Sequence, residues 1–234
     1  MVEGQSDNHT IRYIKKREDT MSRVERARQS VDGTLDRWQI RAEAMEAHLN
    51  VSEKQAMERV EAVKKSYLDN IDKVKAGIAK SKSLADAEKQ RLQTRLDEAR
   101  VQFALGKAET EDEFNKQCMA LKSGLAQLER EVDADLAAID EEDDEFLDQA
   151  VQDLVDGWDA VDAEMDAMTV KFQTMKMETT AGAEAKIAQA KNDLAAFKKK
   201  ISVKRADASE KVQTFSSEFD KGWEQIKAAF KSLE

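Results

Sequence analysis

Proline is absent from all 234 residues, and the chain contains only 8 glycines. Proline interrupts helices more strongly than any other residue, so its absence removes the commonest helix breaker. Aromatic residues make up 6% of the sequence, and no run of β-branched or aromatic residues indicates a strand. These absences argue against a sheet-containing fold and favour long helices.

Cysteine is almost absent as well. Cys118 is the only one, so the chain cannot form an internal disulfide.

The first residues lack the basic start and apolar stretch of a secretory signal. No window approaches the roughly 20 apolar residues of a membrane span. We therefore expect a cytoplasmic protein, although a processed precursor would have the same features.

Helical periodicity is the strongest positive feature of the sequence. Apolar residues recur every three or four positions through residues 11–49, 56–78, 92–103 and 121–233. Charged residues make up 37% of the chain, and many apolar positions are alanine, which buries little area. Thin helix-to-helix seams fit this composition better than a thick core. The sequence predicts an all-α protein whose long amphipathic helices form an elongated antiparallel bundle or coiled coil.

Capping signals locate the expected helix ends. A serine or threonine followed three positions later by an acidic residue or glutamine forms a capping box, as in Ser52–Gln55, Ser83–Asp86 and Thr110–Glu113. The first pair either begins a new helix or lies within a continuous one, and we favour continuity. The second predicts a turn near 79–86. The third, together with Gly106 as a C-cap, predicts a turn at 106–110.

These signals suggest three parts of the chain. Residues 1–9 are expected to form a flexible polar tail. Residues 10–106 are expected to form an N-terminal helical segment, and residues 107–234 a long C-terminal helical hairpin. Its turn is expected near 178–183, where small and polar residues interrupt the apolar pattern.

The first arm of this hairpin would be a single helix from about 110 to 178, roughly 100 Å long at 1.5 Å per residue. Apolar side chains of the two arms are expected to face each other across the turn, namely Phe172 and Met175 with Ile187 and Leu194.

A C-terminal pattern resembles a known group of proteins. Trp158 precedes a Lys/Ala/Glu-rich stretch, and a later segment fits Trp-x-x-[ILV]-[KR]-x-[AG]-[FV], here Trp223-Glu224-Gln225-Ile226-Lys227-Ala228-Ala229-Phe230. Residues 158–234 are therefore similar to uncharacterised bacterial coiled-coil proteins in which a tryptophan opens a helical hairpin. The resemblance implies a hairpin and carries no catalytic residue.

Acidic residues concentrate in residues 129–166, which hold 17 Asp or Glu and one basic residue, while the whole chain has a net charge of −10. The run 140–145 is expected to be a solvated helical stretch or a bend. Clustered carboxylates suit divalent cations, but the spacing does not match an EF-hand. We favour pairing with basic helices over binding of anionic lipid or nucleic acid. The basic clusters are Arg12, Lys15, Lys16, Arg17, Arg23, Arg26 and Arg28, and Lys198, Lys199, Lys200, Lys204 and Arg205.

No set of residues indicates catalysis. His9 and His48 have no second histidine at a metal-ligand spacing, Cys118 fits a core position, and no glycine-rich phosphate loop occurs. We therefore predict a non-enzymatic protein with no catalytic, cofactor-binding or metal-binding residue.

Helix faces remain as the expected means of action. We expect a scaffold or adaptor that acts through helix–helix contacts, as a homo-oligomer or with a helical protein partner. The alternative is a protein that binds an anionic lipid or granule surface through lysine-flanked amphipathic helices, as at 186–205. The acidic net charge makes nucleic acid an unfavourable partner.

Overall fold

Helices dominate the structure, a computed structural model that describes residues 22–29, 31–104, 106–137, 144–177, 183–206 and 212–231. They make up 91% of the described residues, and no strand occurs among them. The predicted all-α class is therefore confirmed. The expected tail at 1–9 and residues 178–182 of the expected turn lie outside this part of the chain. None of the helices described combines the length and the apolar content needed to cross a bilayer.

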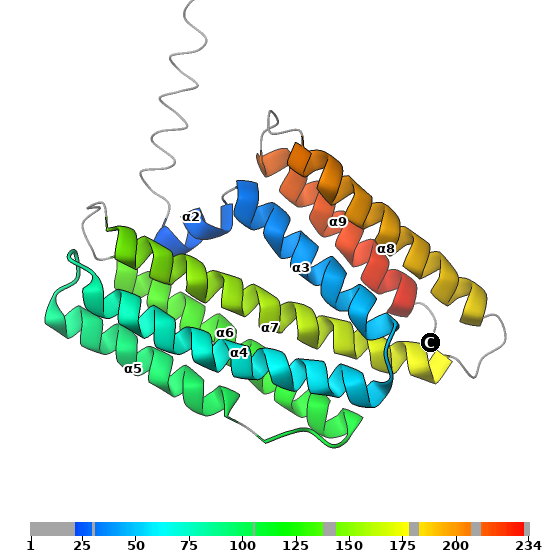
Figure 1. Cartoon of the computed structure of the whole chain (residues 1–234), viewed down its shortest axis with the longest axis horizontal. Helices are drawn as coiled ribbons and strands as arrows, with labels where there is room; N and C mark the ends of the chain where they lie inside the picture. Colours follow the sequence, from blue (N-terminus) through cyan, green and yellow to red (C-terminus); the bar gives the residue numbers. More distant parts are fainter. Residues whose placement is uncertain are drawn as a thin grey trace, which may run out of the picture.

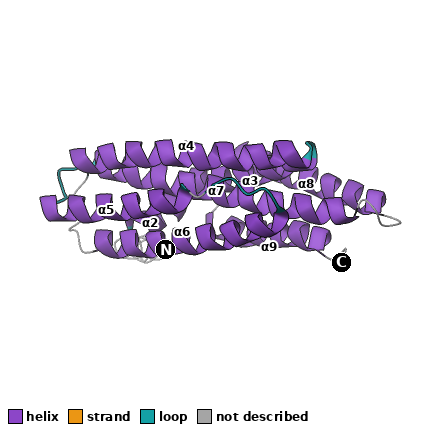
Figure 2. Ribbon diagram, turned by 90° about the horizontal axis from the view of Figure 1, so that it is seen from below, coloured by secondary structure: helices purple, strands orange, loops and turns teal. Residues whose placement is uncertain are grey.

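Figure 1 shows how the helices are arranged along the chain. Those in the described part are α2 (Arg23–Gln29), α3 (Val31–Leu49), α4 (Glu53–Lys80), α5 (Asp86–Phe103), α6 (Glu111–Ala137), α7 (Glu145–Met177), α8 (Ala183–Ala206) and α9 (Val212–Lys231). Helices α4 to α7 lie side by side along one long direction in Figures 1 and 2, whereas α3, α8 and α9 run obliquely to them in Figure 1.

Helices α4 to α7 form a four-helix bundle in which each helix runs antiparallel to the next (Figure 1). Ion pairs connect successive helices: Lys75–Asp97 from α4 to α5 at 2.7 Å, Arg95–Glu131 from α5 to α6 at 3.2 Å, and Glu111–Lys176 from α6 to α7 at 2.7 Å. Helix α7 closes the bundle by packing along α4. The apolar faces predicted from the periodicity point into this first core.

Close approach of α4 and α7 depends on a glycine. A Cβ atom on Gly157 would lie only 2.8 Å from the Tyr67 ring, so a larger residue would push the helices apart. Beside it, the indole N–H of Trp158 donates a hydrogen bond of 2.8 Å to the Tyr67 hydroxyl. Burial raises the pKa of that hydroxyl. The Tyr67–Trp158 pair is therefore polar but satisfied, because its buried donor has an acceptor.

Helices α3, α8 and α9 pack against the C-terminal half of α7 and enclose a second core. Its centre is aromatic: the Trp38 ring lies 5.9 Å from the Phe197 ring and 6.0 Å from the Trp223 ring. Ala163 and Ala167 of α7 are fully buried at this interface, and their small side chains let the neighbouring helices approach closely. Helix α7 thus belongs to both cores.

The predicted single helix from about 110 to 178 is wrong. Helix α6 ends at Ala137 and α7 begins at Glu145, and the two run antiparallel. The Phe114 and Phe172 rings lie 5.5 Å apart although they come from opposite ends of the segment. Folding back buries the apolar faces of both helices in one core, which a single extended helix cannot do.

The predicted contacts across the hairpin are also wrong. Phe172 is 4% exposed in the first core, whereas Leu194 is 2% exposed in the second. Met175 and Ile187 are half-buried. Residues 107–234 form four helices rather than the two arms of one hairpin, because the chain also reverses between α6 and α7 and between α8 and α9.

The favoured continuity through Ser52 is wrong as well. Helix α3 ends at Leu49 and α4 begins at Glu53. The predicted capping box is present: Ser52 Oγ accepts from the Gln55 N–H at 3.3 Å, and Gln55 Oε1 accepts from the Ser52 N–H at 3.1 Å. The box therefore begins a new helix. The break lets α3 turn away from α4 and join the second core.

The turn predicted at 106–110 is confirmed, with α5 ending at Phe103 and α6 beginning at Glu111. Thr110 Oγ accepts from the Glu113 N–H at 3.2 Å, as the capping signal predicts. Gly106 is not the C-cap of α5, because that position is Ala104.

Asp144, just before α7, stabilises the turn between α4 and α5 by accepting hydrogen bonds from it. One carboxylate oxygen, Oδ2, accepts four hydrogen bonds of 2.6–2.9 Å, from the hydroxyls of Ser81 and Ser83 and the N–H groups of Lys82 and Ser83. The other oxygen accepts from the Leu147 N–H at 3.1 Å and so caps α7. The turn thus lies within the segment predicted at 79–86.

Ser83 binds Asp144 instead of capping the next helix, so the capping box predicted from Ser83 and Asp86 is wrong. Helix α5 begins after Ala85, whose N–H donates to Glu88 Oε2 at 2.7 Å. Ser81 and Ser83 lie in the predicted turn, but the carboxylate that accepts their hydrogen bonds lies more than 60 positions along the chain.

Replacing Asp144 by asparagine should lower the free energy of unfolding by about 1–2 kcal/mol at neutral pH. Burial acts to raise the pKa of this carboxyl, but the hydrogen bonds from Ser81, Ser83 and Leu147 outweigh it and hold the pKa well below its usual value. The folded pKa is thus below the unfolded one, so the carboxylate stabilises the fold above about pH 4 and loses this effect as pH falls.

Urea unfolding of both proteins at several pH values measures this effect. The difference in free energy of unfolding between wild type and Asp144→Asn should become smaller at acid pH. Asp97→Asn is the control, since Asp97 pairs with Lys75 on the surface and should cost little at any pH. A gap that is the same at acid and neutral pH would contradict the role of the charge.

Candidate functional site

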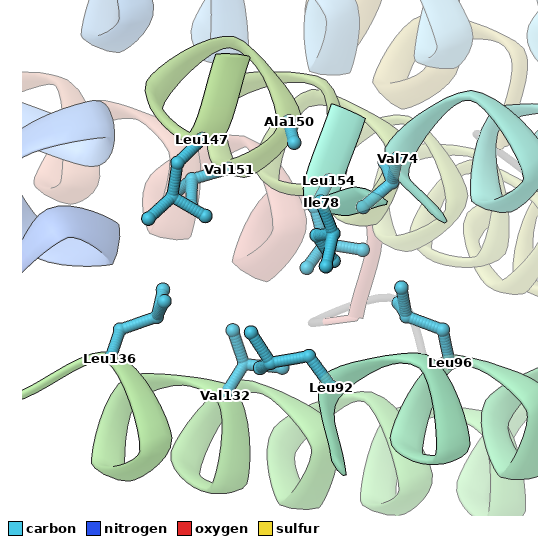
Figure 3. Close-up of a pocket in the computed structure, with 10 residues that line it drawn as sticks. All are labelled: Val74, Ile78, Leu92, Leu96, Val132, Leu136, Leu147, Ala150, Val151 and Leu154. Carbon is cyan, nitrogen blue, oxygen red and sulfur yellow. The ribbon is translucent and has the colours of Figure 1, made fainter. Parts of the chain in front are cut away.

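The interior of the four-helix bundle contains a small apolar cavity near the α4–α5 turn. Figure 3 shows side chains of all four helices around it: Val74, Ile78, Leu92, Leu96, Val132, Leu136, Leu147, Ala150, Val151 and Leu154. Its volume is about 10 Å³, barely enough for one water molecule. Because no polar group lines it, the cavity is expected to stay dry. It is a packing defect rather than a ligand site.

Charged side chains gather where α2, α3, α6 and α7 meet, around a pocket of about 250 Å³. We name this group the arginine–aspartate cluster; it consists of Arg28, Arg37, Arg41, Lys122, Glu129, Asp159 and Asp162, with Trp158 beside them. Its ion pairs are Arg28–Glu129 at 2.6 Å, Arg37–Asp159 at 3.1 Å, Arg41–Asp162 at 2.9 Å and Lys122–Asp162 at 3.2 Å. Every pair joins two different helices.

Two arginines of the cluster also stack on indole rings. The Arg28 guanidinium lies 5.9 Å from the Trp158 ring, and that of Arg41 lies 5.2 Å from the Trp38 ring. The Nε atoms of Arg28 and Arg41 are buried and have no acceptor in the described part of the chain. Cation–π attraction offsets some of that cost. Because Trp158 belongs to the first core and Trp38 to the second, the cluster spans both.

Asp159 is the most enclosed carboxylate of the cluster, with 7% of its surface exposed. Burial raises the pKa of its carboxyl, while the guanidinium groups of Arg37, Arg28 and Arg41 act to lower it. Its charge is therefore matched by cations on α2 and α3. The geometry holds α2 and α3 against α6 and α7 and leaves no carboxylate of the cluster without a cation.

A second buried ionic group joins α3, α4 and α7. His48 is fully buried, and its Nε2 lies 2.5 Å from Glu164 Oε2. Arg59 donates to the other Glu164 oxygen at 2.9 Å. Burial acts to raise the pKa of Glu164, but the contacts with His48 and Arg59 outweigh it and lower that pKa. A substrate cannot reach an imidazole with no exposed surface, so this group ties helices together.

The other residues considered for chemistry lie apart from these groups. Cys118 is 7% exposed in the first core, as its apolar position predicts, and burial raises the pKa of its thiol. His9 lies outside the described residues. Within the described ranges no three His, Cys, Asp or Glu side chains are placed to hold a metal ion.

Two arginines of the first basic cluster pair with the acidic region, as expected. Arg23 pairs with Asp148, and Arg28 pairs with Glu129. Arg12, Lys15, Lys16 and Arg17 lie outside the described part.

Two members of the second basic cluster pair elsewhere. Lys198 and Arg205 pair with Glu46 and Asp36 of α3 rather than with the acidic region. The apolar stripe between its lysines is occupied, because Leu194 and Phe197 are 2% and 5% exposed in the second core. The stripe at 186–205, which was the alternative lipid-binding face, thus contributes Leu194 and Phe197 to a helix–helix interface.

Comparison of the chain with models of protein families, with curated proteins and with solved structures found no match.

Sequence reasoning did not identify the arginine–aspartate cluster. A signal existed: Arg37 and Arg41 are four residues apart, and Asp159 and Asp162 are three apart, so each pair lies on one helix face. Nothing in the sequence showed that these two faces meet, because they are more than 120 residues apart.

Proposed function

We propose that this chain is a non-enzymatic structural protein, a helical scaffold or adaptor that acts through helix–helix contacts. The observation that supports the proposal best is the position of α7. Its N-terminal part packs in the four-helix bundle, and its C-terminal part is also a wall of the second core. One continuous helix of 33 residues, about 50 Å long at 1.5 Å per residue, therefore connects two packed units.

The buried ionic groups support the same reading. The arginine–aspartate cluster and the His48–Glu164–Arg59 group cross from α3 to α7 on the boundary between the cores. Partly buried charge pairs with several hydrogen bonds fix orientation more than they add stability. Such contacts suit a protein that must hold two surfaces at a constant separation.

Large apolar side chains are mostly internal, and the exposed ones in the described part are scattered over four helices: Val101, Met119, Phe146 and Val203. A partner would therefore meet mainly charged helix faces. We propose a second copy of the chain or another helical protein as that partner, and the cytoplasm as the location.

A constant separation is directly measurable. Spin labels at Lys82, in the α4–α5 turn, and at Glu184, at the start of α8, would report the distance between opposite ends of the molecule (Figure 1). Both side chains are exposed, and Cys118→Ala removes the native thiol. Double electron–electron resonance should give one narrow distance distribution, and sedimentation velocity should show association as concentration rises.

A label pair on one helix supplies the control. Glu58 and Lys73 are exposed on α4, and 15 residues of helix separate them by about 22 Å. If the end-to-end distribution is much broader than this reference, the molecule flexes between its cores and the rigid scaffold is ruled out. A monomer at every concentration would exclude the homo-oligomer and leave only a different helical partner.

A further inference from the structure

Residues of α8 and α9 line a groove between these two helices. Its volume is about 530 Å³, within the range of small-molecule sites. The residues that line it are Ala196, Phe197, Lys199, Lys200, Val203, Lys204, Glu218, Phe219 and Gly222. We name it the α8–α9 groove. The proposed scaffold role makes no use of it.

The floor and walls of the groove are apolar. The Phe197 and Phe219 rings lie 5.3 Å apart and are almost fully buried, so only their edges reach the groove. Gly222 lies so close to Phe197 that a Cβ atom there would be 3.3 Å from the ring. Val203 is 56% exposed, which is unusual for a branched apolar side chain. An apolar ligand group placed here would cover surface that water now contacts.

The rim of the groove is basic. Lys198 and Arg205, on the other face of α8, are paired with acidic residues of α3. Lys199 and Lys200 are exposed, and neither forms an ion pair with a described residue. Glu218 is the acidic side chain among the lining residues. The groove therefore combines an apolar floor with excess positive charge in a protein whose net charge is −10.

The size of the groove limits its occupant. On α8 the lining residues run from Ala196 to Lys204, which is about 12 Å of helix at 1.5 Å per residue. A partner helix would find only about two turns of contact there. A flat membrane would not reach the floor of a concave groove. A single acyl chain with an anionic head matches the length, the apolar floor and the basic rim.

We propose that the α8–α9 groove binds one fatty acid, with its chain along Phe197, Phe219 and Val203 and its carboxylate at Lys199 and Lys200. This ligand-binding activity is separate from the scaffold role, and either can hold without the other. Burial of methylene groups would supply most of the affinity, and the lysines would select an anionic head.

Isothermal titration calorimetry with decanoate, below its micelle concentration, tests the proposal on the full chain. One molecule should bind per chain, and affinity should rise about threefold to fourfold for each methylene added to the chain. Decyltrimethylammonium, with the opposite charge, should bind at least about tenfold more weakly. Equal binding of the two probes, or no binding of decanoate, would overturn the proposal.

Two pairs of variants locate the site. Ala196→Phe fills the groove and should abolish binding, whereas Ala195→Phe, on an exposed neighbour that does not line it, should not. Lys199→Glu with Lys200→Glu should weaken binding about tenfold, and the matched change Lys186→Glu with Lys191→Glu should not. Melting curves verify that each variant is folded. Unchanged binding in Ala196→Phe, or binding to anionic vesicles but not to monomeric decanoate, would contradict the proposed groove.

Discussion

Trp223→Ala is expected to lower the free energy of unfolding by about 3–5 kcal/mol, the usual cost of truncating a large buried aromatic side chain. Trp223 is 1% exposed and contacts both Trp38 and Phe197, so its removal leaves a hole in the centre of the second core. Chemical denaturation measures the loss. Amide exchange should accelerate first in α8 and α9, because those helices have no part in the four-helix bundle.

Trp223→Phe is the matched control. The indole N–H of Trp223 is buried without an acceptor in the described part of the chain, so the phenyl ring removes an unsatisfied donor along with some volume. Trp223→Phe should therefore lower the free energy of unfolding much less than Trp223→Ala does. If both variants lose the same stability, the ring does not fill the second core as described. Equal acceleration of exchange in α4, α5 and α6 would show instead that the two cores unfold as one unit.

Phe172→Ala should cost about 3 kcal/mol and lower the melting temperature by about 6–12 °C. Phe172 is 4% exposed and packs on Phe114 near the end of the first core where α6 begins. The loss lies at the low end of the range for phenylalanine because an end of a bundle can partly collapse around the cavity.

Lys176→Ala is the control for this second variant, since Lys176 lies one turn further along α7. Its side chain is 66% exposed and pairs with Glu111. A surface ion pair is worth about 0–1 kcal/mol, so the melting temperature should hardly change. Thermal unfolding followed by circular dichroism compares the two. Melting temperatures that agree within error would show that Phe172 does not face the packed side of α7.

The periodic spacing of apolar residues predicted the helices well because it reports which face of a helix is buried. The side chains that face the core recur every three or four residues, as the spacing requires: Leu92, Leu96, Ala99 and Phe103 in α5, and Phe114, Cys118, Leu121, Leu125, Leu128, Val132 and Leu136 in α6. The same spacing failed to place the reversal between α6 and α7. Apolar residues recur at steps of three or four on both sides of the reversal, and no glycine or proline marks the break.

The local sequence pattern does not show which core an apolar helix face belongs to. Phe172 and Leu194 have the same periodic signature, yet they lie in different cores. Phe146 occupies a position of the apolar pattern but is 44% exposed, while its neighbour Leu147 is 1% exposed. Helix α7 begins directly after Asp144, which accepts hydrogen bonds from the distant Ser81 and Ser83 and caps the helix, and this start places Leu147 rather than Phe146 on the buried face.

The partners of charged residues in the arginine–aspartate cluster could not be predicted from the sequence either. A sequence rich in both charges allows many pairings of similar Coulomb energy, and surface pairs differ little in stability. Arg37 and Asp159 are selected because α3 must lie on α7 to bury Trp38 and Met45. Packing of α3 on α7 thus determines which ion pairs form, and the ion pairs then fix the orientation of the two helices.

The place of α3 in the second core has a consequence for synthesis on the ribosome. Its contacts with α7 join residues more than 110 positions apart, as in Arg41–Asp162 and His48–Glu164. At about 5–20 residues per second, α3 leaves the ribosome roughly 5–25 s before α7 is complete, and α8 and α9 follow later still. Helices α4 and α5 can pair in that interval because their contacts are local. Meanwhile Trp38 and Met45 stay in water, so the nascent chain offers an apolar segment to chaperones until its last helices emerge.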